Sequence, residues 1–139
     1  MNIFLDANIL VSVLNKEYPL YPYTSRILSL LDSPRYQLYT SPICLAIAFY
    51  FAEKKSGRKK GLEKIRLLSS KIKVADVNTS VVMNTVADKS VKDFEDGLEY
   101  YAAKQAACSC LITEDVSDFY FADMEVVNAR SFFERYMAP

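Results

Sequence analysis

Apolar and polar positions follow two patterns that alternate along the chain. Short apolar runs, typical of strands buried in a parallel sheet, occur at residues 2–5, 36–40, 72–77, 109–112 and 124–127. Segments with the apolar spacing of a helix occur at residues 8–14, 23–32, 42–55, 62–68, 79–88, 93–107 and 129–136. Strands that alternate with helices predict an α/β fold, a three-layer α/β/α sandwich whose mainly parallel sheet is covered on both faces.

Serine and proline mark the start of the helix predicted at residues 42–55. Ser41 is a favourable N-cap, and Pro42 fits the first helical position after it. The segment is apolar nearly all round, so we expect this helix to be buried. Pro19 and Pro22, by contrast, interrupt the chain before the second predicted helix.

The composition is that of a globular protein. The chain has 139 residues, 51% of them hydrophobic, which is enough to bury a core as one domain over residues 1–139. Its 17 basic and 17 acidic residues cancel, which excludes a uniformly basic coat for nucleic acid but not a local basic patch. The chain begins without the basic region of a signal peptide, and its longest apolar run, at residues 43–52, is too short to cross a bilayer. We therefore expect a cytoplasmic protein without a membrane segment.

Histidine is absent from the chain, and this limits the chemistry. Its absence excludes Ser-His-Asp and Cys-His catalysis as well as histidine-ligated zinc. An active site must then use carboxylates, hydroxyls, Lys, Arg, Cys or a metal held by oxygen. The three cysteines, Cys44, Cys108 and Cys110, indicate a reducing compartment, and we interpret them as small buried hydrophobic residues.

Acidic residues follow two of the predicted strands. Asp6 comes directly after the first strand, and the fourth strand is followed by Thr113, Glu114, Asp115 and Asp118. The helix that leads into the fourth strand begins with Asp93, Glu95 and Asp96. Ligands of open parallel sheets bind beyond the carboxyl ends of the strands, so we expect these acids to meet there.

Carboxylates that meet in one place repel one another unless a cation neutralises them. Oxygen ligands without histidine or cysteine select hard cations, here Mg²⁺ or Mn²⁺. Such a cation suits phosphodiester cleavage, because it lowers the pKa of a water molecule and offsets negative charge on phosphoryl oxygens.

Each of these acids also has a purely structural interpretation. Asp6 is suited to cap the helix that follows it, and acids near Asp96 are favoured by the positive N-terminus of their helix. Asp115 and Asp118 are suited to cap a one-turn helix. The functional interpretation therefore depends on where the acids lie relative to the strands.

One stretch of the chain is strongly basic. It contains Lys54, Lys55, Arg58, Lys59 and Lys60. Such a stretch is suited to contact a nucleic-acid backbone, and it is equally typical of a solvated helix-loop-helix surface.

Three segments of the chain resemble the PIN domain family, which includes the ribonuclease toxins of bacterial toxin–antitoxin pairs. They are residues 1–10 (MNIFLDANIL), 93–101 (DFEDGLEYY) and 111–119 (LITEDVSDF), and they occur in the family's order over nearly the whole chain. The resemblance implies a parallel five-stranded sheet of order 3-2-1-4-5 between helices.

The resemblance also implies a site and an activity. The metal ligands and catalytic residues would be Asp6, Asp96 and Asp115, with Asp118 as a fourth ligand, while Asn8 and Thr113 would hold the acids by hydrogen bonds. The implied activity is cleavage of RNA by an endoribonuclease that depends on Mg²⁺ or Mn²⁺. Implied partners are RNA, an antitoxin that blocks the site and a second copy of the chain as a homodimer.

One position departs from the family pattern. The family places a glutamate after S-P-x-x-L-A, but here Ile47 follows residues 41–46, and Glu53 lies about 240° further round the helix. The loss of a ligand motivates a second hypothesis, a PIN-fold module that binds RNA or a protein without cleavage. A phosphoacceptor receiver domain fits less well, since it requires an acidic pair after the first strand, where Asp6 is followed by Ala7.

Overall fold

The computed structural model describes residues 1–139 and is built around one five-stranded sheet. The strands lie in the order β3-β2-β1-β4-β5, and every neighbouring pair is parallel. Their bounds are β1 Asn2–Leu5, β2 Gln37–Thr40, β3 Lys73–Val74, β4 Cys110–Ile112 and β5 Glu125–Val127. The predicted fold class and strand order are both confirmed.

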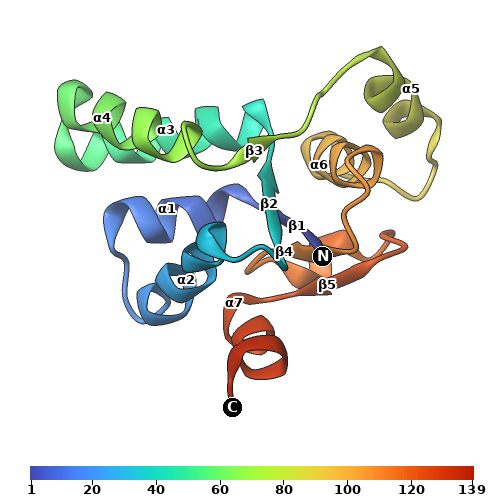
Figure 1. Ribbon diagram of the computed structural model, residues 1–139. Helices are drawn as coiled ribbons and strands as arrows, with labels where there is room; N and C mark the ends of the chain where they lie inside the picture. The colour runs from blue at the N-terminus through green and yellow to red at the C-terminus, as the bar shows by residue number, and fades with distance from the viewer.

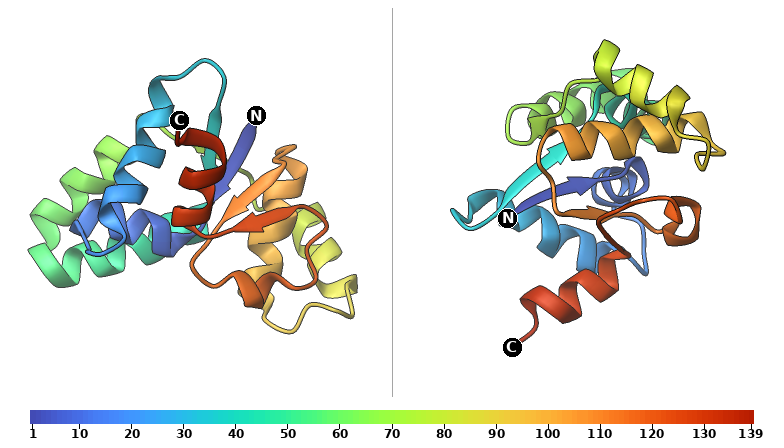
Figure 2. Two further views of the ribbon diagram at one scale, coloured as in Figure 1. Left: turned by 90° about the horizontal axis from the view of Figure 1, so that it is seen from below. Right: turned by 90° about the vertical axis from the view of Figure 1, so that its right-hand side faces the viewer.

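Helices connect the strands and lie on both sides of the sheet. The right-hand view of Figure 2 shows α6 on one side of the strands, with α2 and α7 on the other. The helices are α1 Ala7–Asn15, α2 Tyr21–Leu28, α3 Pro42–Ser56, α4 Arg58–Ser69, α5 Thr79–Ala87, α6 Phe94–Gln105 and α7 Ala129–Phe132. Short turns of helix follow α2 (η1, Ser29–Asp32), β4 (η2, Val116–Phe119) and α7 (η3, Phe133–Met137). Figure 1 shows α3 and α4 side by side next to α1.

The core lies between these layers and begins with β1 and β4. All three residues Ile3, Phe4 and Leu5 are fully buried, and so are Leu111 and Ile112. Both faces of the two central strands are therefore covered, which explains why they read as continuous apolar runs rather than alternating ones.

Helix α3 is not buried all round, and the prediction that it would be is wrong. Its buried residues are Cys44, Ala48 and Ala52, on one side of the helix, whereas Tyr50 and Phe51 are 57% and 41% exposed. The neighbouring elements cover only one face of α3. Apolar side chains on its other faces therefore remain exposed.

Several element boundaries differ from those expected, and three of the differences have a clear local reason. α2 begins at Tyr21, because a proline in the first turn of a helix starts it rather than breaking it. α4 begins at Arg58, after Gly57 turns the chain with a φ of 87°. β3 is only two residues long, since it lies at the edge of the sheet and pairs with β2 alone.

The sheet register decides where the polar residues after the strands come to lie. Leu5 at the end of β1 is paired with Ile112 at the end of β4. The backbone N–H of Asp6 continues this pairing by donating to the carbonyl of Ile112 at 3.0 Å. Asp6 and Thr113 therefore leave the sheet side by side at its carboxyl edge.

Candidate metal centre

Asp6 is buried where β1 passes into α1. Only 7% of the residue is exposed, and its Oδ1 accepts a hydrogen bond from the backbone N–H of Ala7 at 2.6 Å. Asp6 is thus the N-cap of α1, as its structural interpretation expected. Its Oδ2 accepts a hydrogen bond from the Thr113 hydroxyl at 2.7 Å. The same carboxylate therefore caps a helix and faces the end of β4.

Thr113 and Asn8 connect the residues that follow these two strands. The Thr113 hydroxyl also accepts a hydrogen bond from the backbone N–H of Asp115 at 3.0 Å. The Asn8 amide donates to Oδ2 of Asp115 at 3.2 Å, and its carbonyl oxygen accepts from the N–H of Glu114 at 3.3 Å. These bonds tie the start of α1 to the loop after β4 and hold the Asp115 carboxylate in place.

Asp96 reaches the same region from the first turn of α6. Asp93 is the N-cap of that helix, and its carboxylate accepts a hydrogen bond from the backbone N–H of Asp96 at 3.1 Å. Partial burial, and after it the negative charges of Asp93 and Asp6, raise the pKa of Asp96 to about 7. Burial and nearby acids therefore outweigh the favourable positive end of the Asp96 helix, so the ionised form of this carboxyl group is disfavoured without a cation.

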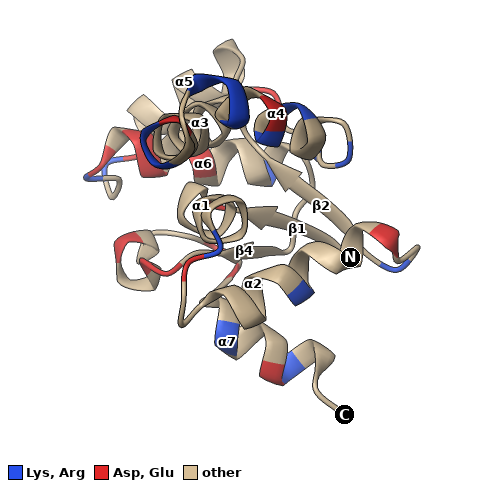
Figure 3. Ribbon diagram, turned by 90° about the vertical axis from the view of Figure 1, so that its left-hand side faces the viewer, with Lys and Arg blue, Asp and Glu red and all other residues tan.

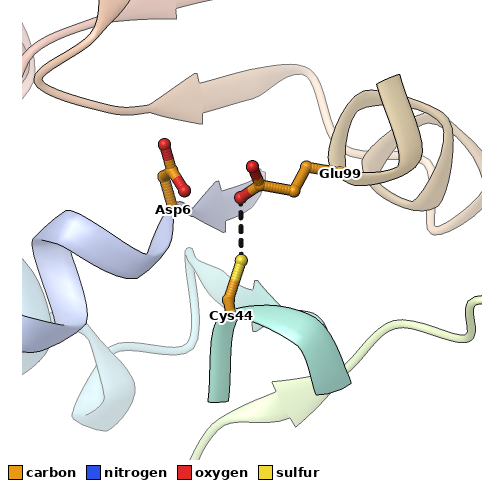
Figure 4. A group of neighbouring side chains, drawn as sticks. All are labelled: Asp6, Cys44 and Glu99. Carbon is orange, nitrogen blue, oxygen red and sulfur yellow. Dashed lines mark hydrogen bonds between the residues drawn. The ribbon is translucent and has the colours of Figure 1, made fainter. Parts of the chain in front are cut away.

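Glu99 lies deeper in the site and is not among the residues predicted from the sequence. The residue is only 2% exposed, and its Oε1 accepts a hydrogen bond from the Cys44 thiol at 2.8 Å. Figure 4 shows its side chain reaching from α6 toward Asp6 and Cys44. Burial, and after it the neighbouring Asp6 carboxylate, raise the pKa of Glu99 to about 11. Without a cation the Glu99 carboxyl is therefore neutral at pH 7.

Two signals in the sequence point to Glu99 in retrospect. It lies three residues after Asp96, which puts the two carboxyl groups on one face of a helix. It also stands among Leu98, Tyr100 and other buried residues, where an acid is costly unless something satisfies it. Neither signal shows how deep the residue lies.

The acids from these elements line one cavity of about 470 Å³. Seven of the 14 residues around it carry carboxyl groups and none is Lys or Arg; the seven are Asp6, Glu17, Glu95, Asp96, Glu99, Glu114 and Asp115. Helix α3 contributes Ile47 and Phe51 to the wall. Glu53 is not part of this wall and lies 3.9 Å from Arg58 instead.

This arrangement suits a hard divalent cation. One ligand atom from each of Asp6, Cys44 and Glu99 lies within 4.8 Å of the other two. Two carboxyl groups this close, with no basic side chain in the cavity wall, are both ionised only if a cation offsets their negative charges. The residues present therefore fit an oxygen-ligated Mg²⁺ or Mn²⁺ ion.

Comparison with known proteins agrees with this geometry. The family model of the PIN domain matches residues 2–117. The chain belongs to the PIN domain family. Ribonuclease VapC1 of Aquifex aeolicus is 27% identical to this PIN domain over 138 residues, covering 96% of this chain and 94% of the relative.

Solved structures share the fold at lower identity. VapBC-1 of nontypeable Haemophilus influenzae is 20% identical with a TM-score of 0.69, covering 94% of this PIN domain and 99% of the other chain. VapBC2 of Rickettsia felis, bound to a DNA fragment from its promoter, is 18% identical with a TM-score of 0.69, covering 92% and 98%. VapC20 of Mycobacterium tuberculosis, described as a toxin that cleaves the sarcin-ricin loop, is 14% identical with a TM-score of 0.62, covering 78% and 86%.

The remaining predicted site residues of this PIN domain lie outside the cavity wall. Asp118 is in η2, where its charge contributes to the raised pKa of Asp96. The basic stretch spans the end of α3 and the start of α4, and all five of its predicted contact residues are exposed. Figure 3, which draws Lys and Arg in blue, shows basic segments around α3 and α4. No helix of the structure has the length and apolar character needed to cross a membrane.

Proposed function

We propose that this PIN domain is an endoribonuclease whose cleavage of RNA depends on Mg²⁺ or Mn²⁺. The observation that carries the proposal is the cavity at the carboxyl edge of β1 and β4, whose wall holds seven carboxyl groups and no basic side chain. The names of two relatives, a ribonuclease and a toxin that cleaves the sarcin-ricin loop, agree with this chemistry.

Asp6, Asp96 and Asp115 would hold the cation, and Asp118 of η2 is the proposed fourth ligand. When bound, the cation lowers the pKa of a water molecule and offsets the negative charge that develops on the phosphodiester. Thr113 keeps the Asp6 carboxylate oriented through its 2.7 Å hydrogen bond. Since the chain has no histidine, a carboxylate of the cavity wall or bulk solvent would accept the proton from the attacking water.

The exposed basic stretch is the part of the surface best suited to the RNA backbone. Lys54, Lys55, Arg58, Lys59 and Lys60 would offset phosphate charge that the acidic cavity repels. Two of the similar structures are VapBC assemblies and a third is a toxin–antitoxin complex from Klebsiella pneumoniae. These support an antitoxin as a protein partner, and we retain a homodimer as the proposed assembly. A cytoplasmic location is also part of the proposal, and the three free cysteines agree with it.

The test compares the wild type with Asp6→Asn in an RNA-cleavage assay with Mn²⁺. Asparagine keeps an oxygen that can cap α1 but removes the charge, so the variant should fold and lose cleavage by several hundred-fold or more. Asp32→Asn is the matched control, because Asp32 is an exposed acid in η1, before β2 and away from the cavity wall. Equal cleavage by wild type and Asp6→Asn, or undiminished cleavage in EDTA, would refute the proposal.

Ile47 in the cavity wall favours one alternative, a PIN domain that binds RNA or a protein without cutting. Calorimetry separates the two functions. The ribonuclease requires Mn²⁺ binding that is lost in Asp96→Asn, together with cleavage. RNA binding without cleavage, by a protein that does not bind Mn²⁺, would establish the alternative.

A further inference from the structure

Helix α3 supplies no carboxyl group to the cavity, and Glu99 supplies one on the side of the cavity that α3 faces. The residues that α3 places in the wall, Ile47 and Phe51, have no ligand atom, and its buried Cys44 offers only a thiol. Glu99 reaches this region from the opposite helix, α6, and one of its oxygens lies within 4.8 Å of a carboxylate oxygen of Asp6. The two acids come from elements 93 residues apart in the chain and meet at the base of the cavity.

We propose that Glu99 is a ligand of the same cation as Asp6, and that the Cys44 thiol positions its carboxylate. This inference rests on the proposed function, since it assigns a further ligand to the cation of that site. Helix α6 would then contribute two ligands one turn apart, Asp96 at the partly exposed mouth of the cavity and Glu99 at its buried base.

A purely structural role explains the position of Glu99 less well. A buried carboxyl group next to another carboxylate costs folding energy, and a leucine or methionine would fill the same space without that cost. The cost is offset when a divalent cation binds between the two groups, because each carboxylate then faces positive charge. The Cys44 thiol donates a hydrogen bond to Oε1 of Glu99, and this bond holds the carboxyl group beside Asp6 without supplying any positive charge.

Cys44 is better suited to orient Glu99 than to bind the cation. Burial, and after it the charges of Glu99 and Asp6, raise the pKa of the thiol, so it keeps its proton. A protonated thiol is a donor rather than a ligand, and hard cations prefer oxygen. Ser41 begins α3 by accepting a hydrogen bond from the backbone N–H of Cys44 at 3.2 Å, which fixes where the thiol points.

The experiment measures Mn²⁺ binding to the full chain by titration calorimetry, so that it does not depend on activity. Glu99→Gln has the shape of the neutral glutamic acid, so it should unfold in EDTA at the same temperature as the wild type or higher. Its affinity for Mn²⁺ should fall at least tenfold. Glu95→Gln is the matched control, because it makes the same substitution in the same helix and cavity wall but outside the group formed by Asp6, Cys44 and Glu99. It should change the affinity for Mn²⁺ only a few-fold.

The thiol is tested by a conservative rescue. Cys44→Ala should weaken Mn²⁺ binding several-fold, and Cys44→Ser, which restores a donor at the same place, should recover most of the loss. If Cys44→Ser binds no better than Cys44→Ala, the positioning role is wrong.

The outcomes separate this inference from the proposed function. Unchanged Mn²⁺ affinity in Glu99→Gln, together with loss of binding in Asp6→Asn, would overturn the role of Glu99 and leave the cation site intact. A wild type that does not bind millimolar Mn²⁺ would overturn both. Weaker binding in Glu99→Gln supports the inference even if no RNA is cleaved.

Discussion

Replacing Glu99 with glutamine should change how the stability of the protein depends on pH in the absence of divalent cations. In the unfolded chain a glutamate loses its proton above a pH of about 4.3. In the folded chain burial and Asp6 raise the pKa of Glu99 to about 11, so the folded state binds one more proton between these values. Its contribution to the free energy of unfolding is therefore greatest at low pH and is lost as the pH rises.

The size of the effect follows from this single proton. The free energy of unfolding should fall by up to about 1.4 kcal/mol per pH unit because of Glu99, or about 2–3 kcal/mol between pH 5.5 and 7.5. Glutamine has no proton to lose, so Glu99→Gln should lack this slope. The variant should therefore gain stability relative to the wild type as the pH rises, a large change for a domain of ordinary stability.

Urea denaturation monitored by circular dichroism, in EDTA at pH 5.5, 6.5 and 7.5, measures the difference in unfolding free energy between the wild type and Glu99→Gln. Other groups such as Asp96 titrate in both proteins, so the comparison isolates position 99. Parallel stability curves for the wild type and Glu99→Gln would show that Glu99 titrates like an exposed acid, and the reasoning from its burial would be refuted.

Three further predictions test other parts of the structure. Thr113→Val removes the hydroxyl that donates to Asp6 and accepts from the backbone N–H of Asp115. The variant should lose about 1.5–3 kcal/mol of unfolding free energy in urea denaturation and should bind Mn²⁺ more weakly. Unchanged stability and unchanged Mn²⁺ affinity would contradict the role of these hydrogen bonds. Gly97→Ala places a methyl group 2.6 Å from the Thr85 side chain, so it should destabilise the packing of α5 on α6 by about 1–3 kcal/mol, and equal or higher stability would be the contrary result. Replacing both Lys59 and Lys60 with glutamine should weaken RNA binding and make it less dependent on salt, as measured by filter binding at several salt concentrations. The affinity for Mn²⁺, measured by calorimetry, should not change. An unchanged salt dependence of RNA binding would argue against this basic surface as the RNA contact.

The α/β class was predictable from local apolar patterns, whereas the strand order that makes β1 and β4 neighbours was implied by the resemblance to the PIN domain family. Short apolar runs such as residues 2–5 and 109–112, separated by helical segments, are typical of strands inside a parallel sheet. Once those strands are neighbours, the acids and hydroxyl that follow them must meet at one edge of the sheet. The convergence of Asp6, Thr113 and Asp115 therefore needs no knowledge of side-chain packing.

The tertiary structure alone decided which side chains lie at the base of the site. Glu99 and Cys44 are 55 residues apart, and neither the i,i+3 spacing of one nor the apolar surroundings of the other shows that they touch. Their contact depends on the distance and rotation at which α3 and α6 pack beside β1. The same packing leaves Tyr50 and Phe51 exposed on a helix whose first ten residues are apolar on every face. Periodicity records which residues tend to be buried, but only the packing of one layer on another determines which of them face the same point in space.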